Sequence, residues 1–411
     1  MQRKKRWVVV GTGHRGVGFF VRALRKNYSD RAEVVGFYDL NPARARMANE
    51  WIGAQIPIYP SFAAMLDEAR PDVLLVATKD STHQEYIVPA LDRGLEVVTE
   101  KPMAVDAKKC RAIMEAARRA KKGKLRVAFN YRYAPYAAKF KALLLSGVVG
   151  KIQSVELAWF LDVRHGADYF RRWHRRKENS GGLFVHKATH HFDIVNWCLE
   201  QAPVEVYARG SLVCYGPTRK ARGVRCLTCK HTKTCEFYLD LAKKEEFQKI
   251  YLGAEHEDRY WRDRCVFDPE INIEDDMAAV VTYSGGAKLS YCLRAYCPFE
   301  GYRISFQGIK GRLEVGIVEG RDKENQAINL YPSFGQPERI LVPRIRDEHG
   351  GGDERMMAAI MDPRLPDPLG QRATARDGAL SILTGVAANE SMRRNRPVRL
   401  DALVPARLLA K

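Results

Sequence analysis

The sequence lacks the features that would place it in a membrane, fibrous or repeat class. No apolar run is long enough to span a bilayer, and the apolar run of the basic N-terminus, MQRKKRWVVVGTG, stops after four residues at a glycine loop. There is no internal repeat and no low-complexity linker. A chain of 411 residues with 46% apolar content can bury a core in each of two domains. We therefore expect a cytoplasmic globular protein with no membrane partner.

Acidic residues are scarce relative to basic ones. The chain has 49 Asp and Glu against 68 Lys and Arg, a formal net charge of +19. The basic residues are spread along the chain, and the cluster at 108–124 has the apolar spacing of a helix with a solvated charged face. No nucleic-acid-binding motif accompanies the charge. We expect no nucleic-acid partner, and an anionic substrate would explain the charge equally well.

Two patterns of secondary structure follow one another along the chain. Apolar strands alternate with helices up to about residue 130, which predicts a parallel sheet covered on both faces. Long strands of alternating polarity then predict a large, mostly antiparallel open sheet with helices on one face. The predicted fold is α/β, with an N-terminal Rossmann dinucleotide-binding domain and a C-terminal α+β domain for substrate binding and oligomerisation. The predicted domains are 1–133 and 134–411, the second with a Cys-rich insertion at about 214–270 and a C-terminal helix at about 372–394.

The segment GTGHRG carries the features of a dinucleotide site. Gly11, Gly13 and Gly16 follow a strand and precede a helix, where glycine allows a tight turn, close approach of a pyrophosphate and helix–strand packing. Asp39 ends the next strand, where its carboxylate can accept hydrogen bonds from ribose hydroxyls. This carboxylate favours NAD over NADP, while Arg44 and Arg46 keep NADP as the alternative.

Several motifs together resemble the Gfo/Idh/MocA oxidoreductase family over about residues 5–320. They are VATKDSTHQEY, GLEVVTEKPMA with EKP at 100–102, NYRYAP at 130–135, and a helix after SGG with histidine and aspartate. The resemblance implies a Rossmann domain followed by an open-sheet α/β domain. It implies that Lys101 lies near the nicotinamide and contacts the reacting hydroxyl, and that the helix after SGG supplies a catalytic histidine, which by spacing is His190. The expected cofactor contacts also include His14, Arg15, Thr78, His83 and Glu100.

The segment HKATHHFD at 186–193 concentrates proton-handling groups. On one helix, His186, His190 and Asp193 share a face at i, i+4 and i+7. Position 186 is usually aspartate in the family that the chain resembles, so a group that only accepts has become one that can also donate. With Lys187 and His191, these residues are predicted to form the floor of a polyol-binding pocket. Zinc or manganese bound by the two histidines and Asp193 is the alternative.

Further substrate contacts are expected from three other segments. Aromatic rings stack on sugar faces, and arginine or histidine binds hydroxyls and carboxylates. For the cationic segment 164–182, a basic surface loop is the competing interpretation. The expected residues are Asn130, Arg132, His165, Tyr169, Arg172, Trp173, His174 and His349, the last in a glycine-rich turn that also presents Asp353.

The segment CLTCKHTKTC has the spacing of a metal site. Cys226, Cys229 and Cys235 form C-x2-C-x5-C, and Cys265 is the expected fourth ligand, with His231 or Cys214 as alternatives. In a cytosolic chain this spacing favours a metal over a disulfide. We expect a structural zinc ion that holds the insertion together; an iron–sulfur cluster and unmetallated thiols are the alternatives.

These observations predict an NAD-dependent oxidoreductase acting on a sugar, glycoside or cyclitol. In this hypothesis His190 takes the hydroxyl proton and Lys101 stabilises the developing alkoxide charge. One alternative is a redox-neutral, NAD-dependent glycoside-cleaving enzyme that oxidises C3 transiently. The other is a non-catalytic protein that binds a dinucleotide or a metal. The open sheet face predicts a homo-oligomer, a dimer or a tetramer.

Overall fold

The computed structural model describes residues 3–120, 122–318, 325–345 and 350–410. The chain forms two compact units, and each is described by itself. Unit 1 comprises residues 1–128, 169–180 and 216–271. Unit 2 comprises residues 129–168, 181–215 and 272–411.

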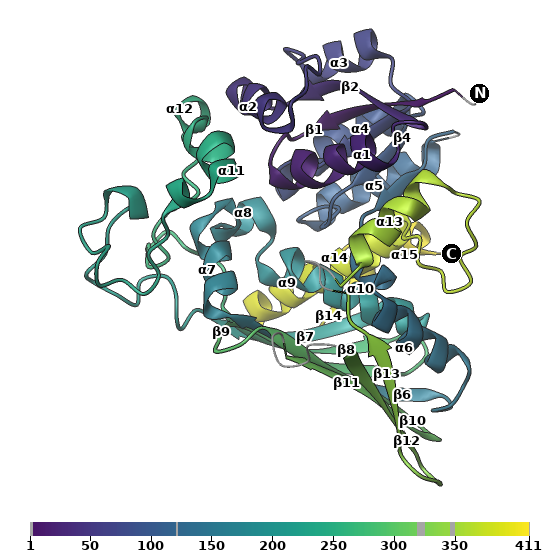
Figure 1. Cartoon of the computed structure of the whole chain (residues 1–411). Helices are drawn as coiled ribbons and strands as arrows, with labels where there is room; N and C mark the ends of the chain where they lie inside the picture. The colour runs from purple at the N-terminus through teal and green to yellow at the C-terminus, as the bar shows by residue number, and fades with distance from the viewer. Residues whose placement is uncertain (1–2, 121, 319–324, 346–349, 411) are drawn as a thin grey trace. The chain divides into compact units, whose positions relative to one another are not determined.

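Unit 1 is built on a five-stranded parallel sheet of order β2-β1-β3-β4-β5. Because β2 and β3 flank β1 on opposite sides, the chain reverses direction across the sheet at β1, and right-handed crossovers then place helices on both faces. Figure 1 shows these elements in purple and blue. The strands are β1 (Lys5–Val10), β2 (Ala32–Tyr38), β3 (Val73–Val76), β4 (Glu96–Thr99) and β5 (Leu125–Val127). The helices are α1 (Arg22–Asn27), α2 (Pro42–Ile52), α3 (Phe62–Ala69), α4 (His83–Asp92), α5 (Ala107–Arg119), α8 (Lys177–Ser180), α11 (Glu245–Phe247) and α12 (Glu255–Asp258).

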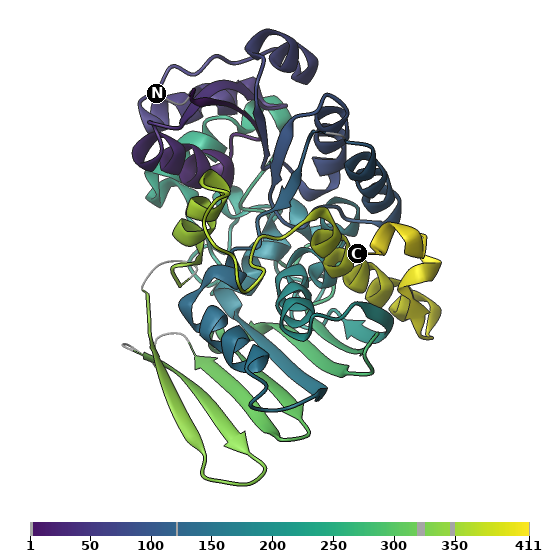
Figure 2. The same ribbon diagram turned by 90° about the vertical axis from the view of Figure 1, so that its right-hand side faces the viewer.

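Unit 2 is built on a nine-stranded sheet of order β13-β12-β11-β10-β6-β9-β8-β7-β14. Only β6 and β9 pair in parallel among its described strands. Figure 1 and Figure 2 both show α10 and α14 on the same face of this sheet. The strands are β6 (Ile152–Asp162), β7 (Pro203–Ser211), β8 (Asp276–Tyr283), β9 (Lys288–Cys297), β10 (Gly301–Gly308), β11 (Gly311–Val318), β12 (Asn325–Pro332), β13 (Glu338–Pro343) and β14 (Val398–Arg399). The helices are α6 (Pro135–Leu145), α9 (Leu183–His186), α10 (Ala188–Leu199), α13 (Gly352–Met361), α14 (Ala375–Arg394) and α15 (Ala406–Leu409), and α7 (Val163–Arg171) crosses the division between the units.

The predicted fold class is confirmed by these two sheets. Alternating burial along β8, where every second side chain is buried, is the pattern of an antiparallel strand with one face on a core. The predicted C-terminal helix corresponds to α14, which begins where Thr374 and Asp377 form a reciprocal capping box. In the part of the chain that the structure describes, no helix has the length and apolar character needed to cross a membrane.

The Cys-rich insertion groups differently from the expected division at residue 133. The sequence placed 214–270 in the second domain, whereas residues 216–271 pack within unit 1. Polar contacts to α2 explain this: the Arg44 guanidinium lies 2.7 Å from Asp258, and the Asn41 amide donates to the carbonyl of Ala254 at 2.8 Å. The insertion is therefore part of unit 1.

Candidate functional site

The glycine loop after β1 has the shape that a pyrophosphate requires. Gly11 has φ +90°, and a Cβ there would lie 2.5 Å from the carbonyl oxygen of Ala77. A Cβ on Gly16 would lie 2.2 Å from the carbonyl oxygen of Gly11, so this glycine allows the helix to pack on the strand. Around Gly13, in contrast, the nearest atom to such a Cβ is the Tyr251 hydroxyl at 3.9 Å. The loop thus leaves space at Gly13, next to the first N–H groups of a helical segment that begins at His14.

Asp39 lies at the end of β2, as predicted, and is held by several donors. One oxygen accepts from the Thr12 N–H at 2.7 Å and the Thr12 hydroxyl at 2.9 Å. The other accepts from the Asn41 N–H at 2.9 Å and lies 3.5 Å from the Arg44 guanidinium. Since Arg44 is also paired with Asp258, its charge is balanced by two carboxylates. This arrangement disfavours a second phosphate beside the ribose and supports the preference for NAD.

Residues of the Cys-rich insertion contact His14, directly after the glycine loop. The His14 imidazole lies 3.8 Å from the Glu246 carboxylate, and its ring meets Phe247 edge-on at 6.4 Å. His14 also stacks on Trp51 at 5.9 Å. Sequence reasoning missed these insertion residues because nothing in their local pattern links them to a glycine loop more than 200 positions earlier.

A charged cluster surrounds Lys101 at the carboxyl edge of the parallel sheet. Asp80, which begins the turn after β3, is 3% exposed, and burial raises its pKa well above the usual range, opposed by the positive charges of Lys101 and Arg172. His174 is 2% exposed, and burial lowers its pKa well below the usual value, with Arg172 and Lys101 acting in the same direction. The structure thus brings together the predicted residues Lys101, Arg172 and His174 and adds Asp80. A carboxylate directly after β3, in VATKD, was the available sequence signal for Asp80.

Two residues expected to contact the cofactor have internal partners instead. His83 is fully buried, with its ring nitrogens 2.9 Å from the Pro102 carbonyl and 3.3 Å from the Thr78 carbonyl. Burial lowers the pKa of His83 to about 4, so the ring is neutral and joins two loops. Glu100 accepts from the Arg15 guanidinium at 2.7 Å. These contacts correct the expected role of His83 to a structural one, because a fully buried ring cannot reach a bound nucleotide.

His190 lies in an aromatic stack within unit 2. Its ring is 5% exposed and stacks on Tyr131 with centroids 4.2 Å apart and planes 10° apart. Tyr131 in turn stacks on Trp159 at 5.8 Å. The Lys187 ammonium donates to the Tyr131 hydroxyl at 3.3 Å and lies 5.2 Å above the Trp159 ring. The predicted pair His190 and Lys187 therefore shares one aromatic wall.

The segment HKATHHFD spans the junction of two helices. α9 ends at His186 and α10 begins at Ala188, and Lys187 between them has right-handed helical backbone angles (φ −90°, ψ −48°), so His186 and His190 stay about one helical turn apart, as predicted. His191 is 1% exposed, hydrogen-bonds the Tyr291 hydroxyl at 2.7 Å and stacks on Trp159 at 3.8 Å. His191 thus lies in the core of unit 2, where it lines one cavity with His190, Tyr131 and Trp159, and its contact with substrate stays a prediction.

Arg132 and Asp193 form a buried ion pair. Two guanidinium nitrogens lie 2.8 Å and 2.5 Å from the two Asp193 oxygens, and the side chains are 2% and 1% exposed. Asp377 lies 3.1 Å from the same guanidinium. Asn130 is likewise 2% exposed and donates to Asp353 at 2.8 Å. Arg132 and Asn130 thus bind carboxylates inside unit 2, which corrects their expected contact with substrate. Asp193 binds Arg132, which corrects its alternative role as a metal ligand.

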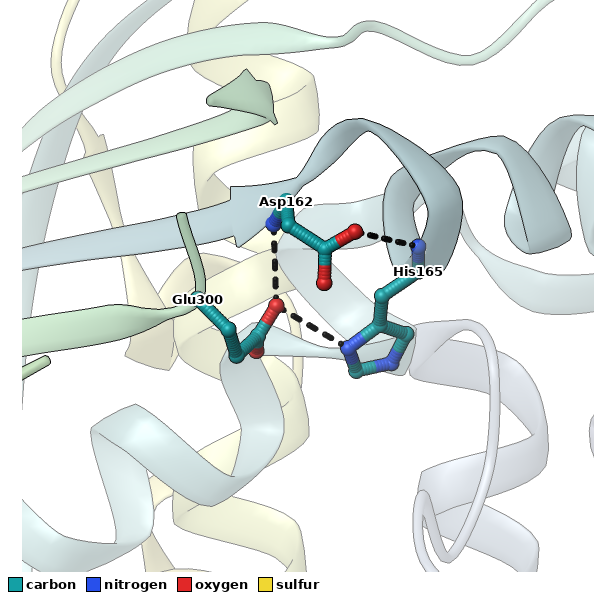
Figure 3. Close-up of side chains that lie close together, drawn as sticks. All are labelled: Asp162, His165 and Glu300. Carbon is teal, nitrogen blue, oxygen red and sulfur yellow. Dashed lines mark hydrogen bonds and ion pairs between the residues drawn. The ribbon is translucent and has the colours of Figure 1, made fainter. Parts of the chain in front are cut away.

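His165 lies at the exposed start of α7, as Figure 3 shows. Its ring nitrogen lies 3.2 Å from Glu300, which also accepts from the Asp162 N–H at 2.9 Å. Asp162 accepts from the N–H groups of Arg164 at 2.8 Å and His165 at 3.2 Å. The carboxylates therefore satisfy the first N–H groups of a helix, the ordinary task of such residues.

Most of the remaining predicted residues lie in unit 1. In unit 1, Trp173 stacks on His174 at 3.6 Å, and the Tyr169 ring meets His174 at 5.6 Å. His349 lies outside the described residues. The four predicted metal ligands, Cys226, Cys229, Cys235 and Cys265, line one cavity of unit 1, which the alternatives His231 and Cys214 do not line. The structural zinc ion stays a prediction.

Comparisons with known proteins agree with this architecture. The Gfo/Idh/MocA family model, described as an oxidoreductase family with an NAD-binding Rossmann fold, matches residues 5–129, and the model of its C-terminal alpha/beta domain matches residues 141–400. A protein of Bacillus subtilis named "Putative oxidoreductase YteT" is 36% identical over 97% of this chain and 98% of its own. An inositol 2-dehydrogenase/D-chiro-inositol 3-dehydrogenase of Lactiplantibacillus plantarum is 25% identical over 49% of this chain and 56% of its own.

Solved structures show the same fold. The WlbA dehydrogenase of Bordetella pertussis, in complex with NADH and UDP-GlcNAcA, has a TM-score of 0.67 at 20% identity and covers 97% of this chain and 98% of its own. The aldose-aldose oxidoreductase of Caulobacter crescentus, complexed with glycerol, has a TM-score of 0.66 at 17% identity and covers 97% of this chain and 100% of its own. At these identities the likeness concerns the fold alone.

Proposed function

Since the chain belongs to the Gfo/Idh/MocA oxidoreductase family, we propose that it transfers a hydride between NAD and a sugar, glycoside or cyclitol hydroxyl. The observation that carries the proposal is the charged cluster of Lys101, Asp80, Arg172 and His174 at the carboxyl edge of a sheet whose glycine loop fits a pyrophosphate. Ligands of open α/β sheets bind at this edge. The relatives named as inositol dehydrogenases support the class of substrate.

The proposed chemistry assigns one task to each residue. Bound NAD supplies the hydride acceptor. His190 takes the hydroxyl proton as the carbonyl forms, and its stacking on Tyr131 fixes the ring plane. The Lys101 ammonium stabilises the negative charge that develops on the oxygen. Asp80 lies close enough to Lys101 and Arg172 for their positive charges to act on its carboxyl group, so these three residues belong to one charged cluster.

The net charge of the chain points to the kind of substrate. Lys and Arg outnumber Asp and Glu by 68 to 49, which gives a formal net charge of +19. A positive field of this kind attracts a polyol that bears a carboxylate or phosphate. We therefore expect acidic sugars to be better substrates than their neutral counterparts.

Absorbance of NADH, recorded with NAD and a panel of neutral and acidic sugars, cyclitols and aryl glycosides, tests the proposal. We expect NADH to accumulate in proportion to substrate. Lys101→Met and His190→Asn should lower kcat about 100-fold or more while NADH binding, followed by fluorescence, persists. Matched control variants are Lys151→Met and His256→Asn, since both side chains are exposed. Aglycone release without net NADH would instead identify redox-neutral cleavage and refute the dehydrogenase proposal.

The homo-oligomer is proposed from the second face of the nine-stranded sheet. That face carries polar side chains at a concavity lined by Glu156, Ser290, Arg303, Arg312 and Glu314. Arg312 pairs with Glu156 at 2.8 Å, which leaves the surface polar but nearly balanced in charge, as suits a second copy of the chain. Light scattering of the purified protein tests this, and a monomer at micromolar concentration would contradict it.

A further inference from the structure

Four cysteines from two distant segments meet in one cavity of unit 1. Cys226, Cys229 and Cys235 come from one loop, and Cys265 comes from a second segment. The two segments are paired by backbone hydrogen bonds, from the Cys226 N–H to the Asp263 carbonyl at 2.8 Å and from the Cys265 N–H to the Val224 carbonyl at 2.9 Å. This pairing fixes Cys265, rather than His231 or Cys214, as the fourth member of the group.

The surroundings of the sulfurs are those of metal-bound thiolates. The His231 N–H lies 3.4 Å from the Cys229 sulfur, and the Arg171 guanidinium donates to the Cys226 sulfur at 3.3 Å. A Cβ on Gly223 would lie 2.9 Å from the Cys229 sulfur, so the backbone approaches this sulfur as closely as glycine permits. Hydrogen bonds to sulfur stabilise thiolates and are a standard feature around protein-bound metals.

The spacing of the sulfurs distinguishes two kinds of centre. One tetrahedral zinc ion with Zn–S bonds near 2.3 Å would hold its four sulfurs about 3.8 Å apart. Among the described His, Cys, Asp and Glu residues, three or more possible ligand atoms lie within 4.8 Å of one another at Asp162, His165 and Glu300, and at no group of cysteines. No three of the four cysteine sulfurs in the described chain are therefore as close as a single zinc ion requires. In an iron–sulfur cluster the thiolates bind different iron atoms, which keeps them further apart.

We propose that Cys226, Cys229, Cys235 and Cys265 bind an iron–sulfur cluster. Arg171 is 6% exposed and lies against Cys226, where its positive charge offsets the negative charge of a thiolate-bound cluster. Lys230 and Lys233, within the cysteine loop itself, add to this compensation. Burial of four thiolates without such charges would be costly.

The proposed iron–sulfur cluster anchors the segment that carries Arg172 and His174. Arg171 contacts the Cys226 sulfur and the Phe237 carbonyl, and Arg175 pairs with Asp268, three residues after Cys265, at 2.7 Å. Both ends of the stretch 171–175 are thus held by the two cysteine-bearing segments. The positive charge of Arg172 acts on Asp80 and on His174, beside Lys101. This anchoring role rests on the proposed function, whereas the iron–sulfur cluster itself does not.

Metal analysis of the full chain, purified without oxygen, tests the cluster. We expect iron and acid-labile sulfide in equal amounts, a broad absorbance near 400 nm that dithionite bleaches, and a native mass that exceeds the sequence mass by a whole cluster. One zinc ion per chain without sulfide would overturn the proposal, as would a metal-free chain that neither retains nor takes up iron and sulfide on reconstitution.

Two cysteine variants test the ligand set and the role. Cys265→Ser should lose most of its iron, and Cys214→Ser, a half-buried cysteine outside the cavity, should keep it. Equal iron in both variants would refute the ligand set. Hydrogen exchange of residues 171–175 should accelerate in Cys265→Ser and on removing iron from the wild type with a chelator. Unchanged exchange in both would refute the anchoring role, and since neither readout needs catalysis, failure of the proposed oxidoreductase function would be seen separately.

Discussion

His83 should make unit 1 sensitive to mild acid. Its ring is fully buried and bridges the carbonyls of Pro102 and Thr78, and burial lowers its pKa from 6.5 to about 4. In the unfolded chain the imidazole binds a proton below about pH 6.5, whereas the folded protein admits one only near pH 4. Between these values the unfolded state holds more protons, so the stability of the folded state falls as the pH is lowered.

The size of this effect follows from the two pKa values. Linkage gives a loss of roughly 2 kcal/mol between pH 7 and pH 5, and about 3 kcal/mol when the pH falls below 4. Urea unfolding at pH 7 and pH 5 measures it. His83→Gln removes the titrating group and should reduce the pH-dependent part of the stability by this amount, whatever its effect at pH 7. His256→Gln, at a side chain that is 66% exposed, is the matched control and should retain the full loss.

A direct titration decides whether the reasoning holds. The imidazole resonances of His83, assigned by comparison with His83→Gln, should stay in the neutral form down to about pH 5. If the ring titrates near pH 6.5 in the folded protein, or if His83→Gln keeps the acid sensitivity of the wild type, then burial of His83 is not its cause.

Three other changes test the described contacts. Asp193→Asn should destabilise the protein by about 1.5–3 kcal/mol in thermal or urea unfolding, because it leaves the buried Arg132 guanidinium with Asp377 as its remaining carboxylate. A loss under about 1 kcal/mol would contradict this. Asp39→Ala should raise kcat/KM for NADP relative to NAD about tenfold or more, since it removes a negative charge beside the ribose and leaves Arg44 balanced by Asp258 alone. An unchanged ratio would show that neither Asp39 nor Arg44 faces the nucleotide. Gly11→Ala should weaken NADH binding in fluorescence titration at least tenfold, because its Cβ would meet a carbonyl oxygen at 2.5 Å; normal affinity would refute the fit of the loop.

Elements with strong local signals were predictable from the sequence. The glycine loop, Asp39 at the end of β2 and Lys101 at the end of β4 each follow an apolar strand, so their place at one edge of a parallel sheet follows from the strand pattern. The three clustered cysteines were equally readable, because a metal site is built largely from ligands close in sequence. The C-terminal helix could be placed because its segment has amphipathic spacing and ends in a stop signal, and the structure adds the capping box of Thr374 and Asp377 at its start.

The partners of individual polar side chains could not be predicted from the local sequence pattern. Arg132, Asn130 and His191 have the residue types of a sugar-binding site, yet each is buried with a partner from a distant segment. A local pattern records which groups a position offers, but the partner that satisfies a buried group is chosen by packing.

By itself, therefore, the sequence determined the order of strands and helices, the glycine loop and the chemical types at the sheet edge, since these depend on periodicity and on neighbours a few residues away. The tertiary structure alone decided that the Cys-rich insertion packs within unit 1 and that Asp80 lies within reach of the charge of Lys101. It also decided for Cys265, which the sequence favoured, against His231 and Cys214 as the fourth residue of the cysteine group. Each of these depends on contacts between residues far apart in the chain, where burial and charge pairing rather than local preference set the free energy.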